Sequence, residues 1–346
     1  MSRRRYLLDI GPGQQRGVAL LDGRPERLIL SRDTDISVQG CGARLIARVR
    51  KLERRLGLAF LDLGEGPDAV LNLKPEHPPL VEGAWIEIVL RAEARLGKGG
   101  LGQFVGLAEG PHRLIEAASD AEAQLRTLAN GAPIETGSAA RAAIDAVEEM
   151  VLEPVHPLPN GGSLAIEPTR ALVAVDVDVG AGGGTSPKHA TRAANLAAIA
   201  ETARLLRLKG LGGLVAIDLA GRGHDGQAIL AAARASFAAD NPGVSLGAIS
   251  RFGLLELTVP RRSRGALEIL SGDGGLVPDA EARGYALLRA LESEAQRSGG
   301  ARIEARAAPA IAAVARPFLI GLTARFGERL AIAGAPQQGD FEVIAR

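Results

Sequence analysis

Two short segments of the chain share one pattern of apolar positions and carry an aspartate at the same point of it. Residues 171–177 are ALVAVDV and residues 213–219 are GLVAIDL, so Asp176 and Asp218 each follow a run of small and β-branched apolar residues. The stretch between them repeats its apolar positions at helical spacing. A strand, a helix and a strand in this order predict two neighbouring parallel strands with both aspartates at the same end.

The hydrophobic pattern divides the rest of the chain into blocks. Residues 5–31 predict a β-hairpin broken by a Gly-Pro-Gly turn, and residues 36–108 contain about five short alternating strands, which is typical of a small β-barrel. Residues 109–165 hold a helix between prolines, and residues 166–262 hold the strand–helix–strand unit. Residues 263–346 mix helices and short strands and predict a small lobe. The predicted fold class is therefore α/β, with α+β character overall.

Composition limits the possible classes of protein. The chain has 346 residues, a formal net charge of +1 and one cysteine, Cys41, so a single copy holds neither a disulfide nor a cysteine-based zinc site. This cysteine usage is typical of a reducing cytoplasm. No run of about eighteen apolar residues is present and the start is polar, which predicts neither a membrane span nor a secretory signal. Ten of the first fifty residues are arginine and five are acidic, which suits a local basic patch.

Three aspartates are candidates for a metal site. Strand alternation places Asp176 and Asp178 on one face, and Asp218 on the neighbouring strand can converge with them. Carboxylates without soft ligands favour Mg²⁺, or Mn²⁺, which polarises a phosphate and acidifies a water. The segment GAGGGTSP, residues 180–187, offers backbone N–H groups to a phosphate but lacks the P-loop pattern. The alternative is that each aspartate only ends a strand or begins a turn.

Five further side chains are candidates for RNA contact. Arg192 and Asn195 lie about one turn apart on a helix and either contact RNA, fix the carboxylates or belong to a solvated helix start. Arg251 follows a strand and either contacts a phosphate or ends that strand. Phe60 either stacks a base on the barrel or fills its core, and Lys98, in a glycine-rich loop, either grips a phosphate or is merely solvated.

These segments resemble the ribonuclease E/G family of bacterial endoribonucleases. The resemblance is carried by PNGGSLAIEPTRALVAVDVDVG from residue 159, by NLAAIAETARLLRLKGLGGLVAIDLAG from residue 195 and by ISRFGLLEL from residue 249. AFLDLG, from residue 59, stands where the family usually has AFVDYG. The similarity covers nearly the whole chain and is weakest at residues 110–157.

The resemblance implies a fold and an activity. It implies a Mg²⁺-dependent endoribonuclease that cuts single-stranded RNA by attack of a metal-activated water, in cytoplasmic RNA processing or turnover. Asp176 and Asp218 match the aspartates that hold the Mg²⁺, and Asp178 stands where the family usually has an asparagine near the scissile phosphate. The implied domains are an RNase H-like lobe (1–35 and 109–165), an inserted RNA-binding OB-fold barrel (36–108), a DNase I-like catalytic lobe (166–262) and a C-terminal small lobe (263–346).

The chain departs from the family pattern at several points. Val70 aligns with the second aromatic of the barrel's stacking platform. Residues 268–278 lack the cysteines of the family's zinc link, so an oligomer, if formed, is not zinc-linked. The short segment 110–157 holds one Arg-Thr pair, Arg126 and Thr127, in unfamiliar surroundings, which predicts a reduced or absent pocket for a 5′-monophosphate.

Two other functions fit the residues. One is an RNA-binding protein of the same family with weak or lost cleavage, which the extra charge of Asp178 and the missing aromatic at Val70 favour. The other is an unrelated metal-dependent phosphatase or nucleotidase. Cutting of a labelled RNA that depends on Mg²⁺ distinguishes the nuclease from the RNA-binding protein, which retards RNA and leaves it intact.

Overall fold

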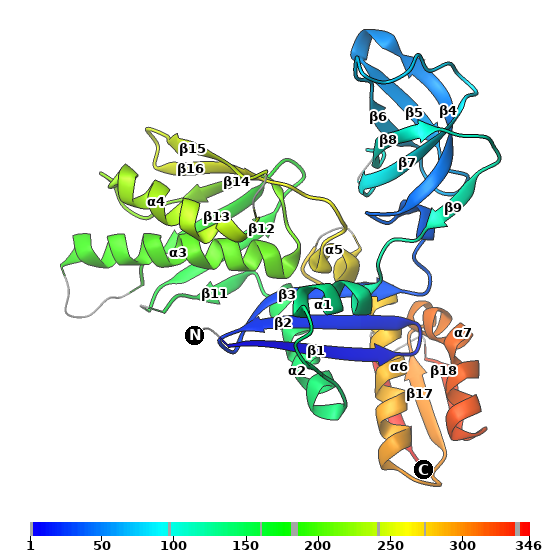
Figure 1. Ribbon diagram of the computed structural model, residues 1–346. Helices are drawn as coiled ribbons and strands as arrows, with labels where there is room; N and C mark the ends of the chain where they lie inside the picture. Colours follow the sequence, from blue (N-terminus) through cyan, green and yellow to red (C-terminus); the bar gives the residue numbers. More distant parts are fainter. Residues whose placement is uncertain are drawn as a thin grey trace. The chain divides into compact units, whose positions relative to one another are not determined.

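The computed structural model divides the chain into two compact units, one holding a five-stranded barrel and the other holding mixed sheets covered by helices (Figure 1). The barrel unit comprises Ser31–Thr127 and Arg261–Arg264, and the remainder forms the second unit. The predicted mixed α/β class and the predicted barrel are therefore confirmed. The residues described are 3–95, 98–159, 161–180, 186–240, 243–272, 275–335 and 340–346.

The barrel closes on itself through five strands. Their order is β5-β6-β8-β7-β4, and a further β4–β5 pairing completes the ring, while β9 extends β4 at one end. Alternate residues point inward, so Ala59 and Leu61 are buried and the intervening Phe60 is only half-buried. The strands are β4 (Arg44–Glu53), β5 (Leu58–Asp62), β6 (Ala69–Asn72), β7 (Trp85–Ala92), β8 (Leu101–Leu107) and β9 (Arg113–Glu116).

The first sheet of the second unit has four strands, and three of them, β1, β2 and β3, form a meander that is longer than the predicted hairpin. Its order is β10-β1-β2-β3, with β10 parallel to β1. Helix α2 packs against β1 and β2 and buries Ile144, Val147 and Val151. The elements are β1 (Arg4–Gly11), β2 (Gln14–Leu21), β3 (Arg24–Arg32), β10 (Ile134–Glu135) and α2 (Ser138–Leu152). Most of α1 (Ala121–Ala129) belongs to the barrel unit.

The second sheet holds the two aspartate strands. Its order is β11-β12-β13-β14-β16-β15, and β13 and β14 are parallel neighbours, which confirms the predicted strand–helix–strand unit. Helix α3 packs against β12 and β13, and α4 packs against α3 and β15. The elements are β11 (Val155–Pro157), β12 (Ser163–Pro168), β13 (Val173–Asp178), α3 (Pro187–Lys209), β14 (Gly213–Asp218), α4 (Gly226–Ser236), β15 (Ser245–Ile249) and β16 (Leu254–Val259).

The C-terminal residues form a three-stranded sheet, β18-β17-β19, together with the paired helices α6 and α7. By length and composition alone, α7 is the one described helix that could cross a membrane. The same helix packs against α6 and β18 and buries Ile311, Ala312, Ala315 and Leu322. The elements are α5 (Ala266–Ser271), α6 (Ala280–Arg297), β17 (Ile303–Ala307), α7 (Pro309–Phe326), β18 (Leu330–Gly334) and β19 (Phe341–Ala345).

Candidate active site

Two carboxylates lie side by side at the end of β13 and β14. Asp176 is the direct register partner of Asp218, and both side chains are exposed while Val175 and Ile217 beside them are buried. Neighbouring strands are about 4.8 Å apart, and Mg²⁺ binds oxygens at about 2.1 Å, so one cation can contact both groups. Among the described residues, neither carboxylate takes part in an ion pair or a side-chain hydrogen bond. Two unpaired hard-oxygen donors at this spacing fit Mg²⁺ or Mn²⁺.

Asp178 lies on the same exposed face but farther along β13. The pairing of β13 with β14 ends at Asp176, and Asp178 is opposite Ser163 of β12 instead. Its Oδ1 accepts a hydrogen bond from the Gly180 backbone N–H at 3.0 Å and so closes a turn. The described residues contain no metal-binding group of three or more Asp, Glu, His or Cys side chains. The structure therefore brings two carboxylates together, and the catalytic role of Asp178 stays a prediction.

The segment after β14 is fixed by Asn195 of α3. The Asn195 side chain is buried, donates to the Ala220 carbonyl at 3.0 Å and accepts from the Ala220 N–H at 2.9 Å. Both ends of the amide are used within the protein, two residues beyond Asp218. The amide thus contacts the backbone after Asp218 and no carboxylate, and the functional role considered for Asn195 stays a prediction. The glycine-rich residues 181–185, considered above for phosphate binding, lie outside the described residues.

Arg192 lies at the exposed start of the same helix. Its Nη2 is 3.4 Å from Oδ2 of Asp225, and its side chain is 56% exposed. Asp225 is the N-cap of α4 and accepts a hydrogen bond from the Ala228 N–H. Arg192 thus links the first turns of α3 and α4 and still presents its guanidinium to solvent.

The turn between β15 and β16 belongs to the same edge of the sheet. Leu254, the first residue of β16, is the register partner of Asp218, and the Leu219 N–H donates to the Gly253 carbonyl at 3.4 Å. Arg251 and Phe252, both exposed, occupy this turn. Phe252 was not among the residues predicted to contact RNA. The signal that could have identified it is an aromatic residue in a Ser-Arg-Phe-Gly turn, a position at which the hydrophobic core needs no aromatic side chain.

On the barrel, Phe60 points away from the core. Its register partners are Lys51 on β4 and Val70 on β6, and Val70 is in turn the partner of the exposed Leu101 on β8. Four neighbouring strands thus present one outward row of side chains. The core role considered for Phe60 falls to Ala59 and Leu61, which are fully buried.

Lys98 lies close in sequence to this row and is held by its backbone. Its N–H donates to the Arg95 carbonyl at 2.6 Å, and the Arg95 N–H donates back at 2.9 Å. Two residues later, the Gly100 carbonyl accepts from the Val70 N–H at 2.6 Å. The exposed Lys98 side chain therefore extends from a fixed turn beside the residue opposite Phe60.

Arg126 and Thr127 are both engaged within α1. Arg126 pairs with Glu122 at 2.5 Å, and the Thr127 hydroxyl donates to the Ala123 carbonyl at 2.9 Å. Each contact joins residues four positions apart on one helix. The predicted reduction or absence of a 5′-monophosphate pocket stays a prediction.

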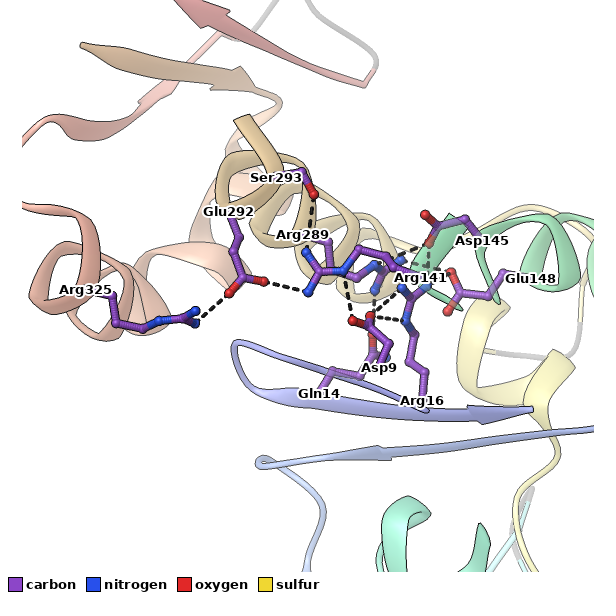
Figure 2. Close-up of polar contacts among 10 residues, drawn as sticks. All are labelled: Asp9, Gln14, Arg16, Arg141, Asp145, Glu148, Arg289, Glu292, Ser293 and Arg325. Carbon is purple, nitrogen blue, oxygen red and sulfur yellow. Dashed lines mark hydrogen bonds and ion pairs between the residues drawn. The ribbon is translucent and has the colours of Figure 1, made fainter. Parts of the chain in front are cut away.

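A buried network of charges, not anticipated from the sequence, joins β1, β2, α2 and α6 (Figure 2). Arg16 is fully buried and lies 2.6 Å from Asp9, 2.6 Å from Asp145 and 3.1 Å from Glu148. Burial opposes the charged form of Arg16, but these three carboxylates raise its pKa. Arg289 of α6 pairs with Glu148 at 2.9 Å. The network therefore holds its charges in pairs.

Arg141 extends the network toward α7. It lies 2.8 Å from Asp9 and 2.7 Å from Glu292, and Glu292 also binds Arg325 at 2.5 Å. Burial favours the protonated form of Asp9, but Arg16 and Arg141 outweigh it and lower the pKa of that carboxyl. Asp9 is thus a stable anion with two cationic partners, whereas Asp176 and Asp218 have no ion-pair partner among the described residues.

A cleft of about 580 Å³ opens beside this network. Its lining carries equal numbers of cations and anions and therefore offers no net attraction to a phosphate. None of the lining residues belongs to the Asp176–Asp218 edge. The charged lining residues are Arg141, Arg297 and Arg325, and Asp9, Asp145 and Glu292.

Two buried bases stabilise the end of α2. Lys209 is fully buried and donates to the carbonyls of Val151 and Glu153, at 2.7 and 2.6 Å, and burial lowers its pKa to about 8. His156 is 5% exposed, and its Nε2 is buried without a hydrogen-bond partner. Burial, with Lys209 and Arg204 nearby, lowers the pKa of His156 to about 4. His156 is therefore neutral in the folded protein at pH 7.

Comparisons with known proteins match the part of the chain that carries the aspartate pair. Residues 114–262 match the model of the ribonuclease E/G family. Ribonuclease E of Escherichia coli (strain K12) is 34% identical over 158 residues, which are 43% of this chain and 15% of that protein. Ribonuclease E of Buchnera aphidicola subsp. Acyrthosiphon pisum is 33% identical over 159 residues, 43% of this chain and 17% of the relative.

A chloroplast protein is also similar. The ribonuclease E/G-like protein of Arabidopsis thaliana is 36% identical over 118 residues, 33% of this chain and 12% of the relative. The matched part of the chain thus covers between 12% and 17% of the length of these three proteins.

Proposed function

Because the chain belongs to the ribonuclease E/G family, we propose that it is a Mg²⁺-dependent endoribonuclease that cleaves single-stranded RNA in RNA processing or turnover. The observation that carries the proposal is the pair of exposed carboxylates, Asp176 and Asp218, in direct register on neighbouring parallel strands. Mn²⁺ is a possible substitute for Mg²⁺, and zinc has no part in the proposal.

In this proposal the residues near the carboxylate pair have different roles. Asp176 and Asp218 hold the cation, which supplies charge stabilisation at the scissile phosphate and a more acidic water when bound. Asn195 fixes the segment after Asp218 through Ala220, so the second carboxylate keeps its place. Asp178 presents a further negative charge on the same face, which opposes the approach of a phosphodiester.

Other residues bind and orient the RNA. Arg192, at the start of α3, and Arg251, in the turn before the register partner of Asp218, present exposed guanidinium groups, which suit phosphate oxygens. On the barrel, Phe60 offers an outward ring to a base and Lys98 a charge to the backbone. Because Val70 stands opposite Phe60, stacking there rests on one aromatic ring.

The family also suggests the identity of each part of the fold. We assign the closed five-stranded barrel to an OB-fold within residues 36–108, and residues 1–35 with 109–165 to an RNase H-like lobe. Residues 166–262 form a DNase I-like catalytic lobe in this assignment, and residues 263–346 form a small lobe. A cytoplasmic location and oligomers without a zinc link complete the proposal.

An RNA-binding protein without cleavage is the second candidate. The charge of Asp178 and the aliphatic Val70 favour it, because the first repels a phosphate and the second narrows the stacking surface. This RNA-binding protein would use the same RNA-binding residues as the proposed nuclease.

The deciding experiment incubates the purified protein with a labelled unstructured RNA in Mg²⁺ or in EDTA. Cutting that needs Mg²⁺, and that is lost in Asp176→Asn and Asp218→Asn, supports the nuclease. Glu328→Gln, an exposed carboxylate of the C-terminal lobe, is the matched control and should cut normally. RNA that is retarded but intact in Mg²⁺ supports the binding protein instead.

A further inference from the structure

An exposed phenylalanine marks the edge of the sheet that carries the carboxylate pair. Phe252 is 73% exposed, and the other phenylalanine, tyrosine and tryptophan side chains that the structure describes are buried or half-buried. It lies outside the hydrophobic core clusters. Removing a phenyl ring from water is favourable, so an exposed ring on a fixed support is available to a planar ligand.

The turn that carries Phe252 is held in one conformation. The Gly253 N–H donates to the Ser250 carbonyl at 3.0 Å, and the Ser250 N–H donates to the Leu254 carbonyl at 2.9 Å. The Ser250 hydroxyl oxygen accepts from the N–H groups of Phe252 and Leu254, at 3.2 and 3.3 Å. Gly253 has a φ of +92°, a conformation that favours glycine. The backbone that carries the ring is thus preorganised, which lowers the entropy cost of binding.

The same turn lies beside Asp218. Leu254 is the register partner of Asp218, and β16 runs antiparallel to β14, so the residues just before Leu254 lie just past the end of β14. Asp176 is at this end too, since it is the partner of Asp218 on the other side. An RNA whose phosphodiester reaches the two carboxylates therefore places a neighbouring nucleotide at the turn.

The guanidinium group of Arg251 lies over the Phe252 ring. The guanidinium carbon is 4.7 Å from the centroid of the Phe252 ring, a cation–π arrangement. Both side chains are exposed. A flat apolar face and a guanidinium side by side match the two parts of a nucleotide, its base and its phosphate.

We propose that Arg251 and Phe252 form a nucleotide platform that stacks an unpaired base next to the cleaved phosphodiester. The proposal rests on the proposed function and extends it, because it names a second stacking site besides Phe60. The occupant is one base of single-stranded RNA, and Arg251 holds its phosphate. Because every base has a π-face, the platform tolerates all four and prefers those that stack most strongly.

The test measures binding without cleavage. A short RNA carries the fluorescent base 2-aminopurine at successive positions around its mapped cleavage site, and EDTA keeps it intact. Stacking on Phe252 quenches the probe at one position. Phe252→Ala should remove this quenching and raise the Kd of the RNA about 5- to 100-fold. Phe252→Trp should restore both, and Arg251→Gln should lower the salt dependence of binding by about one phosphate contact.

Ile320→Ala is the matched control, because Ile320 of α7 is 77% exposed and lies outside the proposed platform. It should leave quenching and Kd unchanged. Equal quenching and equal Kd in Phe252→Ala and the wild type would overturn the platform, as would a self-association that Phe252→Ala abolishes while RNA binding is intact.

The binding and cleavage assays can reject the platform and the proposed nuclease activity independently of each other. If quenching depends on Phe252 but no RNA is cut in Mg²⁺, the platform is supported and the nuclease is rejected. If cutting depends on Asp176 and Asp218 while Phe252→Ala binds RNA as the wild type does, the nuclease is supported and the platform is rejected.

Discussion

Arg16→Met should destabilise the protein more than any surface arginine substitution. Arg16 is fully buried and contacts Asp9, Asp145 and Glu148. The methionine fills similar space but leaves two buried carboxylates with one cation fewer. Breaking a buried ion pair from one side costs about 3–5 kcal/mol, because the remaining charge is buried without full compensation.

The remaining contacts of the three carboxylates indicate a loss of unfolding free energy at the lower end of that range. After the substitution Asp9 keeps Arg141 at 2.8 Å and Glu148 keeps Arg289 at 2.9 Å. Asp145 is about half exposed and recovers hydration. We therefore expect the free energy of unfolding to fall by about 3 kcal/mol.

Urea unfolding followed by far-UV circular dichroism measures this change. Tryptophan fluorescence is less suitable because Trp85, the only tryptophan, belongs to the barrel unit. The control is Arg126→Met, which breaks an exposed pair with Glu122 and should cost less than about 0.5 kcal/mol. A loss below about 1 kcal/mol for Arg16→Met would refute the reasoning, since the network would then contribute no more than surface pairs do.

Three further outcomes are expected. Asp218→Asn should lower cleavage at saturating Mg²⁺ on the order of 10²-fold or more with the fold retained, which initial rates and circular dichroism check; a near wild-type rate would contradict the carboxylate-pair site. Phe60→Ala should weaken RNA binding by about 1–3 kcal/mol, and Lys98→Ala should weaken it less and lower its salt dependence by about one phosphate, both measurable by titration. The pKa of His156 is lowered to about 4, so its stabilising contribution of up to about 3 kcal/mol should be complete above pH 6.5 and lost as the pH falls toward 4; His156→Phe should flatten this part of the stability profile.

The two strands that carry Asp176 and Asp218 were predictable because the pattern that specifies each strand is local. Each aspartate follows a run of β-branched residues, and a helix lies between the two runs. A strand–helix–strand unit strongly favours parallel, neighbouring strands, and this is the pairing that the structure contains. The outward direction of Phe60 was also within reach, because the alternation of Ala59, Phe60 and Leu61 places the two small or aliphatic residues on one face.

For Asp178, the alternation of side chains along β13 predicts the face of the sheet but not the neighbouring residues. The pattern places Asp176 and Asp178 on one face, which is correct, but β14 ends opposite Asp176 and offers Asp178 no partner. The length of a neighbouring strand depends on pairing across the sheet, not on the sequence of β13. Asn195 presents a similar difficulty, because burial against the β14 turn comes from the packing of α3 onto the sheet.

The buried charged network also depends on contacts between residues that are far apart in the sequence, which sequence patterns do not predict. Asp9 and Arg16 are register partners on β1 and β2, within the segment predicted as a hairpin, but the hairpin pattern did not specify this register. The further partners of the pair lie more than a hundred residues away and come from the packing of α2: Arg141 contacts Asp9, and Asp145 and Glu148 contact Arg16. Sequence patterning thus identifies charged residues but not whether their charge is compensated. That distinction separates Asp9, which has two cations, from Asp176, whose lack of one among the described residues suits it to a metal.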